Sequence, residues 1–61
     1  MKRFIPFIEL DNGKTIIITN AKYTAEEANK IACEEVQRVP FKSKILMYGA
    51  MREDNVAYLA N

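Results

Sequence analysis

Few side chains in this chain of 61 residues have the types and spacing that catalysis requires. Ser43 is the only serine, and the chain contains no histidine that could activate it as a nucleophile. Cys33 is the only cysteine and stands beside Glu34 and Glu35, whereas a reactive thiol needs positive charge nearby. We therefore interpret Cys33 as a small apolar residue at the edge of a helix face, with a redox or intermolecular disulfide role as the alternative. The sequence predicts no enzyme and no cofactor.

Acidic residues occur in adjacent pairs at Glu26-Glu27, Glu34-Glu35 and Glu53-Asp54. Adjacent residues on a helix point about 100° apart, so the helical pairs do not converge as an acid and a base would. Zinc would need about four Cys or His ligands, and this chain has one such residue. We expect a solvated helix face and no metal site. Glu35 alone falls within the apolar stripe of the helix, which suggests either a marginal position or a polar contact with a partner chain.

Basic and aromatic residues alternate after the predicted helix, in a pattern that could hold a single-stranded nucleic acid. The residues concerned are Arg38, Phe41, Lys42, Lys44 and Arg52. The formal net charge is only +1, however, and nucleic-acid-binding domains usually carry a clear basic excess. Binding of nucleic acid by the ridge from Arg38 to Lys44 is therefore the alternative interpretation.

The elements that would position these residues can be read from the sequence. Two apolar segments, from about Arg3 to Leu10 and from Lys14 to Thr19, flank Asp11-Asn12-Gly13, which is typical of a tight hairpin with a bulge. Pro6 cannot donate a ladder hydrogen bond, so its strand should lie at an edge or have Pro6 facing outward.

A helix is predicted from about residue 24 until Pro40 ends it. Thr24 and Glu27 form a capping-box pattern, and Arg38 would lie in the last turn. Its apolar stripe, at helical spacing, consists of Ala25, Ala28, Ile31, Ala32, Val36 and Val39.

Residues 43–51 and 56–61 predict a second hairpin, with Arg52 to Asn55 as its turn, although residues 45–51 would also suit a short helix. The predicted fold is a single α+β domain of order ββαββ. In it, a four-stranded, mainly antiparallel sheet packs one helix on one face.

Several predicted strands are apolar on both sides, most clearly at Ile16, Ile17 and Ile18. One helix covers one face only, and contiguous apolar patches usually mark interfaces. We expect a partner chain, most simply a second copy, at an interface containing Ile5, Phe7, Ile16, Ile18, Tyr48 and Glu35. The sequence does not decide which face meets the helix.

No stretch approaches the about 20 apolar residues of a membrane span, and the N-terminal segment lacks the pattern of a signal peptide. We therefore expect a cytoplasmic protein without membrane contact. The leading hypothesis is a small, homodimeric, non-enzymatic module that binds and modulates another protein, such as a phage or mobile-element accessory factor. Neither the identity of that protein nor the source organism follows from the sequence.

Overall fold

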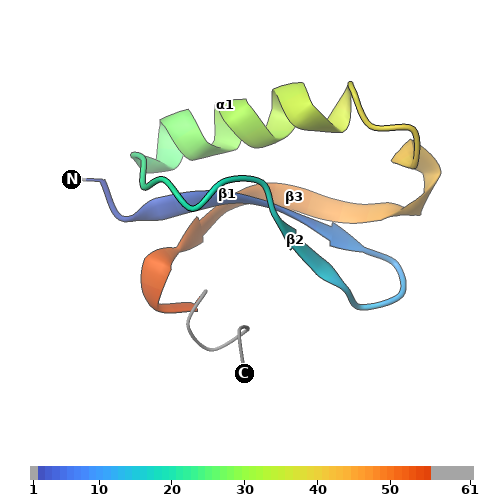
Figure 1. Cartoon of the computed structure of the whole chain (residues 1–61), viewed down its shortest axis with the longest axis horizontal. Coiled ribbons are helices and arrows are strands. Elements are labelled where there is room, and N and C mark those ends of the chain that lie inside the picture. The colour runs from blue at the N-terminus through green and yellow to red at the C-terminus, as the bar shows by residue number, and fades with distance from the viewer. Residues whose placement is uncertain (1, 56–61) are drawn as a thin grey trace.

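A computed structural model describes residues 2–55 of the chain, which form a three-stranded antiparallel sheet with one helix packed against it (Figure 1). The elements follow the order β1 (Phe4–Leu10), β2 (Thr15–Ile17), α1 (Ala25–Val36), the 3-10 turn η1 (Lys42–Lys44) and β3 (Ile45–Arg52). The strands lie side by side in the order β2-β1-β3. The α+β class is confirmed, with the order ββαβ.

The predicted fourth strand lies outside the described residues. The turn predicted before it is wrong in its conformation, because β3 continues through Arg52 and residues 53–55 are helical. The choice between strand and helix for residues 45–51 is settled in favour of a strand, since all of them belong to β3.

The hairpin between β1 and β2 has the predicted turn. Gly13 takes a positive φ of 90°, and its N–H donates to the carbonyl oxygen of Leu10 at 3.0 Å. The N–H of Leu10 in turn donates to the carbonyl of Lys14 at 2.8 Å, which closes a three-residue loop. A glycine is favoured at this position because residues with a Cβ rarely adopt such a φ.

Pro6 lies in the central strand with a fully buried side chain, so both predicted alternatives, an edge position and an outward-facing Pro6, are wrong. Its carbonyl oxygen accepts from the N–H of Ile18, which places its missing N–H on the side of β2. In a regular ladder the N–H of residue 6 would also donate to the carbonyl of Ile18, and proline has no N–H. β2 ends one residue earlier, at Ile17. The central strand therefore tolerates the proline, and the proline accounts for the shortness of β2.

The helix begins at the predicted capping box. The Thr24 hydroxyl accepts from the N–H of Glu27 at 3.2 Å, while the Thr24 N–H donates to the Glu27 carboxylate at 3.1 Å. This second bond lowers the pKa of Glu27. Its contribution to stability is therefore present above the unfolded pKa of the carboxyl group and is lost as the pH falls through the lowered folded value. The helix ends at Val36, so Arg38 and Val39 lie beyond it, contrary to the prediction.

Replacing Thr24 by alanine should lower the free energy of unfolding by about 0.5–2 kcal/mol, because one N–H at the helix start loses its acceptor. Chemical denaturation of the two proteins measures the difference. Thr19→Ala is the matched control, since the Thr19 hydroxyl accepts from the N–H of Ala21 in an exposed turn outside the helix. Equal unfolding midpoints for Thr24→Ala and the native protein would show that the cap contributes nothing.

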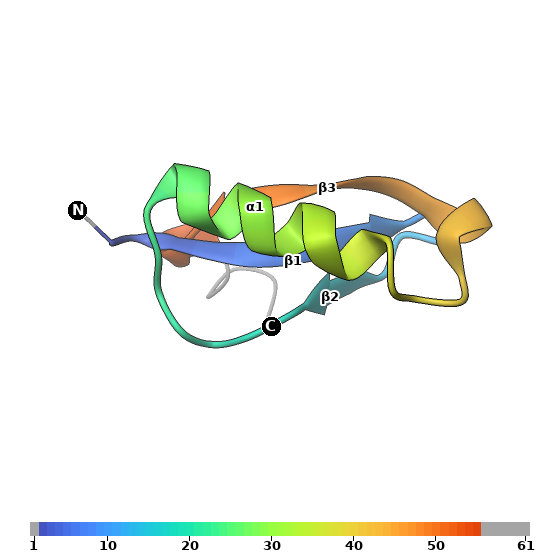
Figure 2. The same ribbon diagram turned by 90° about the horizontal axis from the view of Figure 1, so that it is seen from above.

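The helix packs on the sheet face that carries Pro6, Ile8, Ile16 and Tyr48, here called the helix-covered face. Cross-strand pairing aligns Ile8 with both Ile16 and Tyr48, so their side chains share this face. The Tyr48 hydroxyl reaches the Cys33 sulfur on the helix at 3.9 Å, which identifies the face. Seen from above, α1 runs over β1 and β3 and leaves β2 uncovered (Figure 2).

Small residues bring the helix close to the sheet. Ala28 and Ala32 have no exposed surface, and Ile8 beneath the helix is 1% exposed. Gly49 in β3 has a φ of +151°, and a Cβ there would lie 3.2 Å from Oδ1 of Asn29 on the helix. The apolar stripe predicted for the helix therefore meets the sheet at Ala28 and Ala32.

Candidate interaction edge

The outer edge of β3 has no neighbouring strand among residues 2–55. A strand at an edge leaves a row of backbone N–H and C=O groups unpaired, which is a template for pairing with another chain. β3 is eight residues long, whereas β2 at the opposite edge has three. Because short edge strands resist such pairing, β3 is the better candidate for contact with a partner.

Three consecutive apolar side chains of β3 are exposed to solvent. The exposed fraction is 65% for Leu46, 50% for Met47 and 41% for Tyr48. The register of β3 against β1 shifts at this point, because Glu9 pairs with Met47 and Leu10 pairs with Ile45. Leu46 is therefore the extra residue of a bulge, and bulges are common at sheet edges. We call these three residues together the β3 edge.

Tyr48 is held in place by the helix. Its hydroxyl donates to the Cys33 sulfur at 3.9 Å, and the thiol itself is half-buried. This hydrogen bond raises the pKa of Tyr48, because ionisation would remove the donated proton and place a charge beside the sulfur. The predicted position of Cys33 at the margin of the helix face is confirmed. The contact also fixes the direction of one aromatic ring on the β3 edge.

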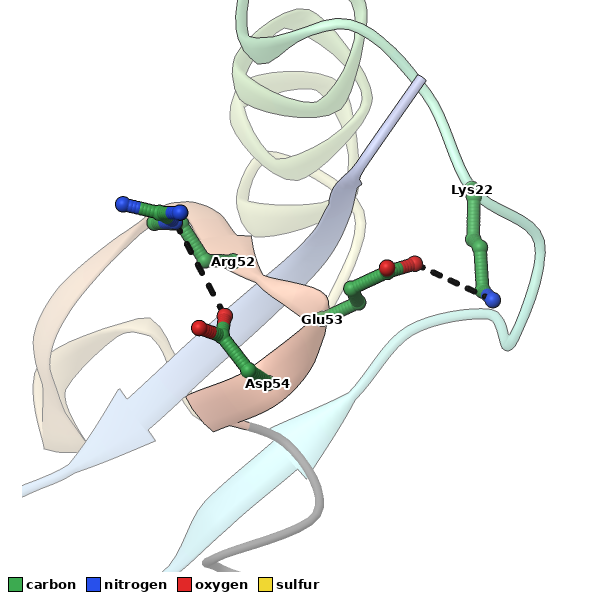
Figure 3. A network of polar contacts seen from close by, with 4 residues as sticks. All are labelled: Lys22, Arg52, Glu53 and Asp54. Carbon is green, nitrogen blue, oxygen red and sulfur yellow. Dashed lines mark ion pairs between the residues drawn. The ribbon is translucent and has the colours of Figure 1, made fainter. Parts of the chain in front are cut away.

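Charged residues flank β3 at both ends. Lys42 and Lys44 are exposed in the 3-10 turn that precedes it. At its other end, Glu53 pairs with Lys22 at 3.0 Å and Asp54 with Arg52 at 3.7 Å (Figure 3). All four of these side chains are more than one-third exposed, so each pair contributes only about 0–1 kcal/mol to stability.

The residues predicted to form one interface do not share one sheet face. Phe7 pairs with Ile17, so these two side chains and Ile5 lie on the face away from the helix. Ile16 instead pairs with Ile8 on the helix-covered face. Ile5 and Phe7 are only 5% and 7% exposed, and neither presents a free surface in the single chain. Contact of this predicted set with a partner stays a prediction.

Glu35 and the predicted basic ridge lie around the end of the helix. Glu35 is half-buried and lies 3.9 Å from the exposed guanidinium of Arg38. Phe41 is half-buried next to Lys42 and Lys44. Arg52 does not join them, because it is eight residues from Lys44 along an extended strand, about 26 Å away.

Sequence reasoning included Tyr48 in the interface but missed Leu46 and Met47. A signal for them exists in "KILMYGAM", in which four consecutive large apolar residues break the alternation expected of a strand with one wet face. That signal does not distinguish a strand buried on both sides from an exposed edge. The pairing order of the sheet makes the distinction, because it places β3 at one edge of the sheet that residues 2–55 form.

Residues 2–55 contain no group of three His, Cys, Asp or Glu side chains that could hold a metal ion. No helix in this part of the chain is long and apolar enough to cross a membrane.

Comparison with known proteins adds no relationship: no family model, no curated protein and no solved structure matches the chain.

Proposed function

We propose that this protein is a small, non-enzymatic protein-interaction module that acts as a homodimer and binds and modulates another protein. The proposal rests chiefly on the β3 edge, where exposed apolar side chains accompany the side of β3 that has no neighbouring strand among residues 2–55. Addition of a strand to an exposed sheet edge is a common mode of protein recognition. Main-chain hydrogen bonds supply affinity in this mode, and alternate side chains supply specificity.

Size supports an interaction role. A single core of fewer than about 70 residues seldom supplies more than about 3–5 kcal/mol of stability, and oligomerisation is one way to add to it. Leu46, Met47 and Tyr48 contribute little to the core of the single chain while they remain exposed. Burial of their apolar surface against another chain would gain free energy that the single chain forgoes.

The test compares two lysine substitutions on opposite edges of the sheet. Met47→Lys places a charge on the β3 edge. Thr15→Lys places a charge on β2, which pairs with β1 and forms the opposite edge of the sheet. Purified native protein is expected to exceed the 7.0 kDa monomer mass in light scattering at micromolar concentration. We expect Met47→Lys to remain folded but monomeric, and Thr15→Lys to behave as the native protein does.

The same variants test binding of a second protein. Affinity capture from a lysate of the source cells, followed by mass spectrometry, should recover a protein with native bait and Thr15→Lys, and lose it with Met47→Lys. A captured protein that is retained equally by all three baits would show that binding does not use the β3 edge. A native chain that is monomeric and captures nothing would overturn the proposed function.

A nucleic-acid-binding regulator is the second candidate. The observation that favours it is the exposed pair Lys42 and Lys44 in a 3-10 turn, with Phe41 beside them. Phosphate contacts release counterions, so such binding would weaken log-linearly as salt is raised. Fluorescence anisotropy with a labelled single strand, at several salt concentrations, separates this candidate from apolar pairing at the β3 edge. If this candidate is correct, the double variant Lys42→Gln and Lys44→Gln should reduce the slope of the logarithm of the binding constant against the logarithm of the salt concentration.

A further inference from the structure

We infer that the occupant of the β3 edge is a second copy of this chain, whose own β3 pairs antiparallel to the first with Gly49 at the centre. The inference rests on the proposed function and specifies the homodimer in it. Three independent features of β3 carry it: the direction of its backbone groups, the charges at its two ends and the positions of its exposed side chains.

The backbone groups that β3 offers to a partner follow from the hydrogen bonds of β1. The carbonyl of Arg3 accepts from the N–H of Glu53, so Arg3 directs its backbone groups toward β3. Alternate residues of a strand point the same way, and therefore Ile5 and Phe7 do so too. Their partners in the register are Met51 and Gly49, which bond inward. Tyr48 precedes Gly49, and Ala50 lies between Gly49 and Met51. By the same alternation, Tyr48 and Ala50 point their N–H and C=O groups away from β1, toward the free side of β3.

The charges at the ends of β3 favour antiparallel pairing. Lys42 and Lys44 precede the strand, and Glu53 and Asp54 follow it. Parallel pairing would place four lysines together at one end, whereas antiparallel pairing places the lysines of each copy beside the carboxylates of the other. Like charges that face each other across strands are destabilising, and opposite charges are favourable.

The exposed side chains select the register. With Gly49 opposite Gly49, the outward-bonding Tyr48 pairs with Ala50 of the second copy. Met47, which is 50% exposed, then faces the half-buried Met51 of the second copy on the same side of the sheet. Lys44, just before β3 of one copy, then lies at the same end of the strand pair as Asp54, which follows β3 of the other copy and whose side chain is 70% exposed. No side chain stands on the two-fold axis, because Gly49 has none.

The resulting assembly has a defined shape. Two antiparallel strands related by a two-fold axis require that axis to be perpendicular to the sheet. The two copies would therefore form one continuous six-stranded sheet, in the order β2-β1-β3-β3-β1-β2, with both helices on the same face. For the described residues 2–55 of each copy, this arrangement pairs the two β3 edges with each other and leaves the short β2 strands at the margins.

Disulfide formation between two different variants tests this register. Met47→Cys and Met51→Cys are each made in a Cys33→Ser background, so that each chain carries a single thiol. In the inferred register residue 47 of one copy faces residue 51 of the other at about 4.5 Å between Cα atoms, within the range that a disulfide spans. Residue 47 lies about 13 Å from residue 47 of the other copy, which is out of range.

An equimolar mixture of the two variants, oxidised at micromolar concentration, should therefore give a mixed disulfide dimer in at least tenfold excess over either self-linked dimer. Thr15→Cys in the same background is the control on the opposite edge and should not link to either variant. Thermal unfolding of the reduced proteins confirms that each variant is folded before oxidation.

Each outcome bears on the inference. Predominant self-linking of Met47→Cys, or equal linking of all pairs including Thr15→Cys, would overturn the register. A native protein that is monomeric in light scattering at micromolar concentration would overturn self-pairing. In that case, loss of a captured protein in Met47→Lys would still support the other part of the proposed function, binding of another protein at the β3 edge, so the two failures are distinguishable.

Discussion

Replacing Ile8 by alanine is expected to lower the free energy of unfolding by about 2–5 kcal/mol, the usual cost of truncating a fully buried isoleucine. Ile8 is 1% exposed and lies in the central strand beneath the helix, paired with Ile16 on one side and Tyr48 on the other. A core of this size rarely supplies more than about 3–5 kcal/mol in total. The variant should therefore be largely unfolded near room temperature, as circular dichroism during urea denaturation would show.

Leu46→Ala is the matched control for this prediction. It removes a similar aliphatic side chain, but one that is 65% exposed, so the stability of the monomer should change by no more than about 0.5 kcal/mol. Both variants are compared with the native protein at a concentration low enough to keep it monomeric. If the two substitutions cost the same, Ile8 is not at the centre of the core.

Enlarging Ala32 to leucine is expected to destabilise the protein by about 1–3 kcal/mol, because extra methyl groups in a close-packed contact force the helix away from the sheet. Ala32 has no exposed surface, and the helix approaches the sheet through it and Ala28. Ala25→Leu makes the same change in the first turn of the same helix, at an exposed position. Because leucine and alanine are both good helix formers, Ala25→Leu should lie within about 0.5 kcal/mol of the native protein.

Urea denaturation of the two alanine variants measures this difference directly. The expected result is a lower midpoint for Ala32→Leu alone, with an unchanged slope. A native midpoint for Ala32→Leu would mean that the contact between helix and sheet adapts to a larger side chain and that the small residues do not set the spacing.

The sequence by itself determined the features that depend on neighbouring residues. The capping box of Thr24 and Glu27 needs only residues three positions apart, and the turn at Gly13 needs only one residue that tolerates positive φ. Both were predicted and both are present. The face of the helix that meets the sheet was likewise predictable from the spacing of Ala28 and Ala32, because the helical period fixes which residues share a side.

The tertiary structure decided everything that depends on which strands become neighbours. Ile16 and Ile17 are chemically identical, and only the register with β1 places the first on the helix-covered face and the second on the opposite one. Pro6 could occupy the central strand because β2 stops beside it, an arrangement of two segments that no local rule predicts. The same holds for the β3 edge: Leu46 and Met47 belong to an apolar run that fits either a buried strand or an exposed edge, and the order β2-β1-β3 leaves them exposed. A strand's own residues specify its two faces, whereas the pairing of the whole sheet specifies its free edge.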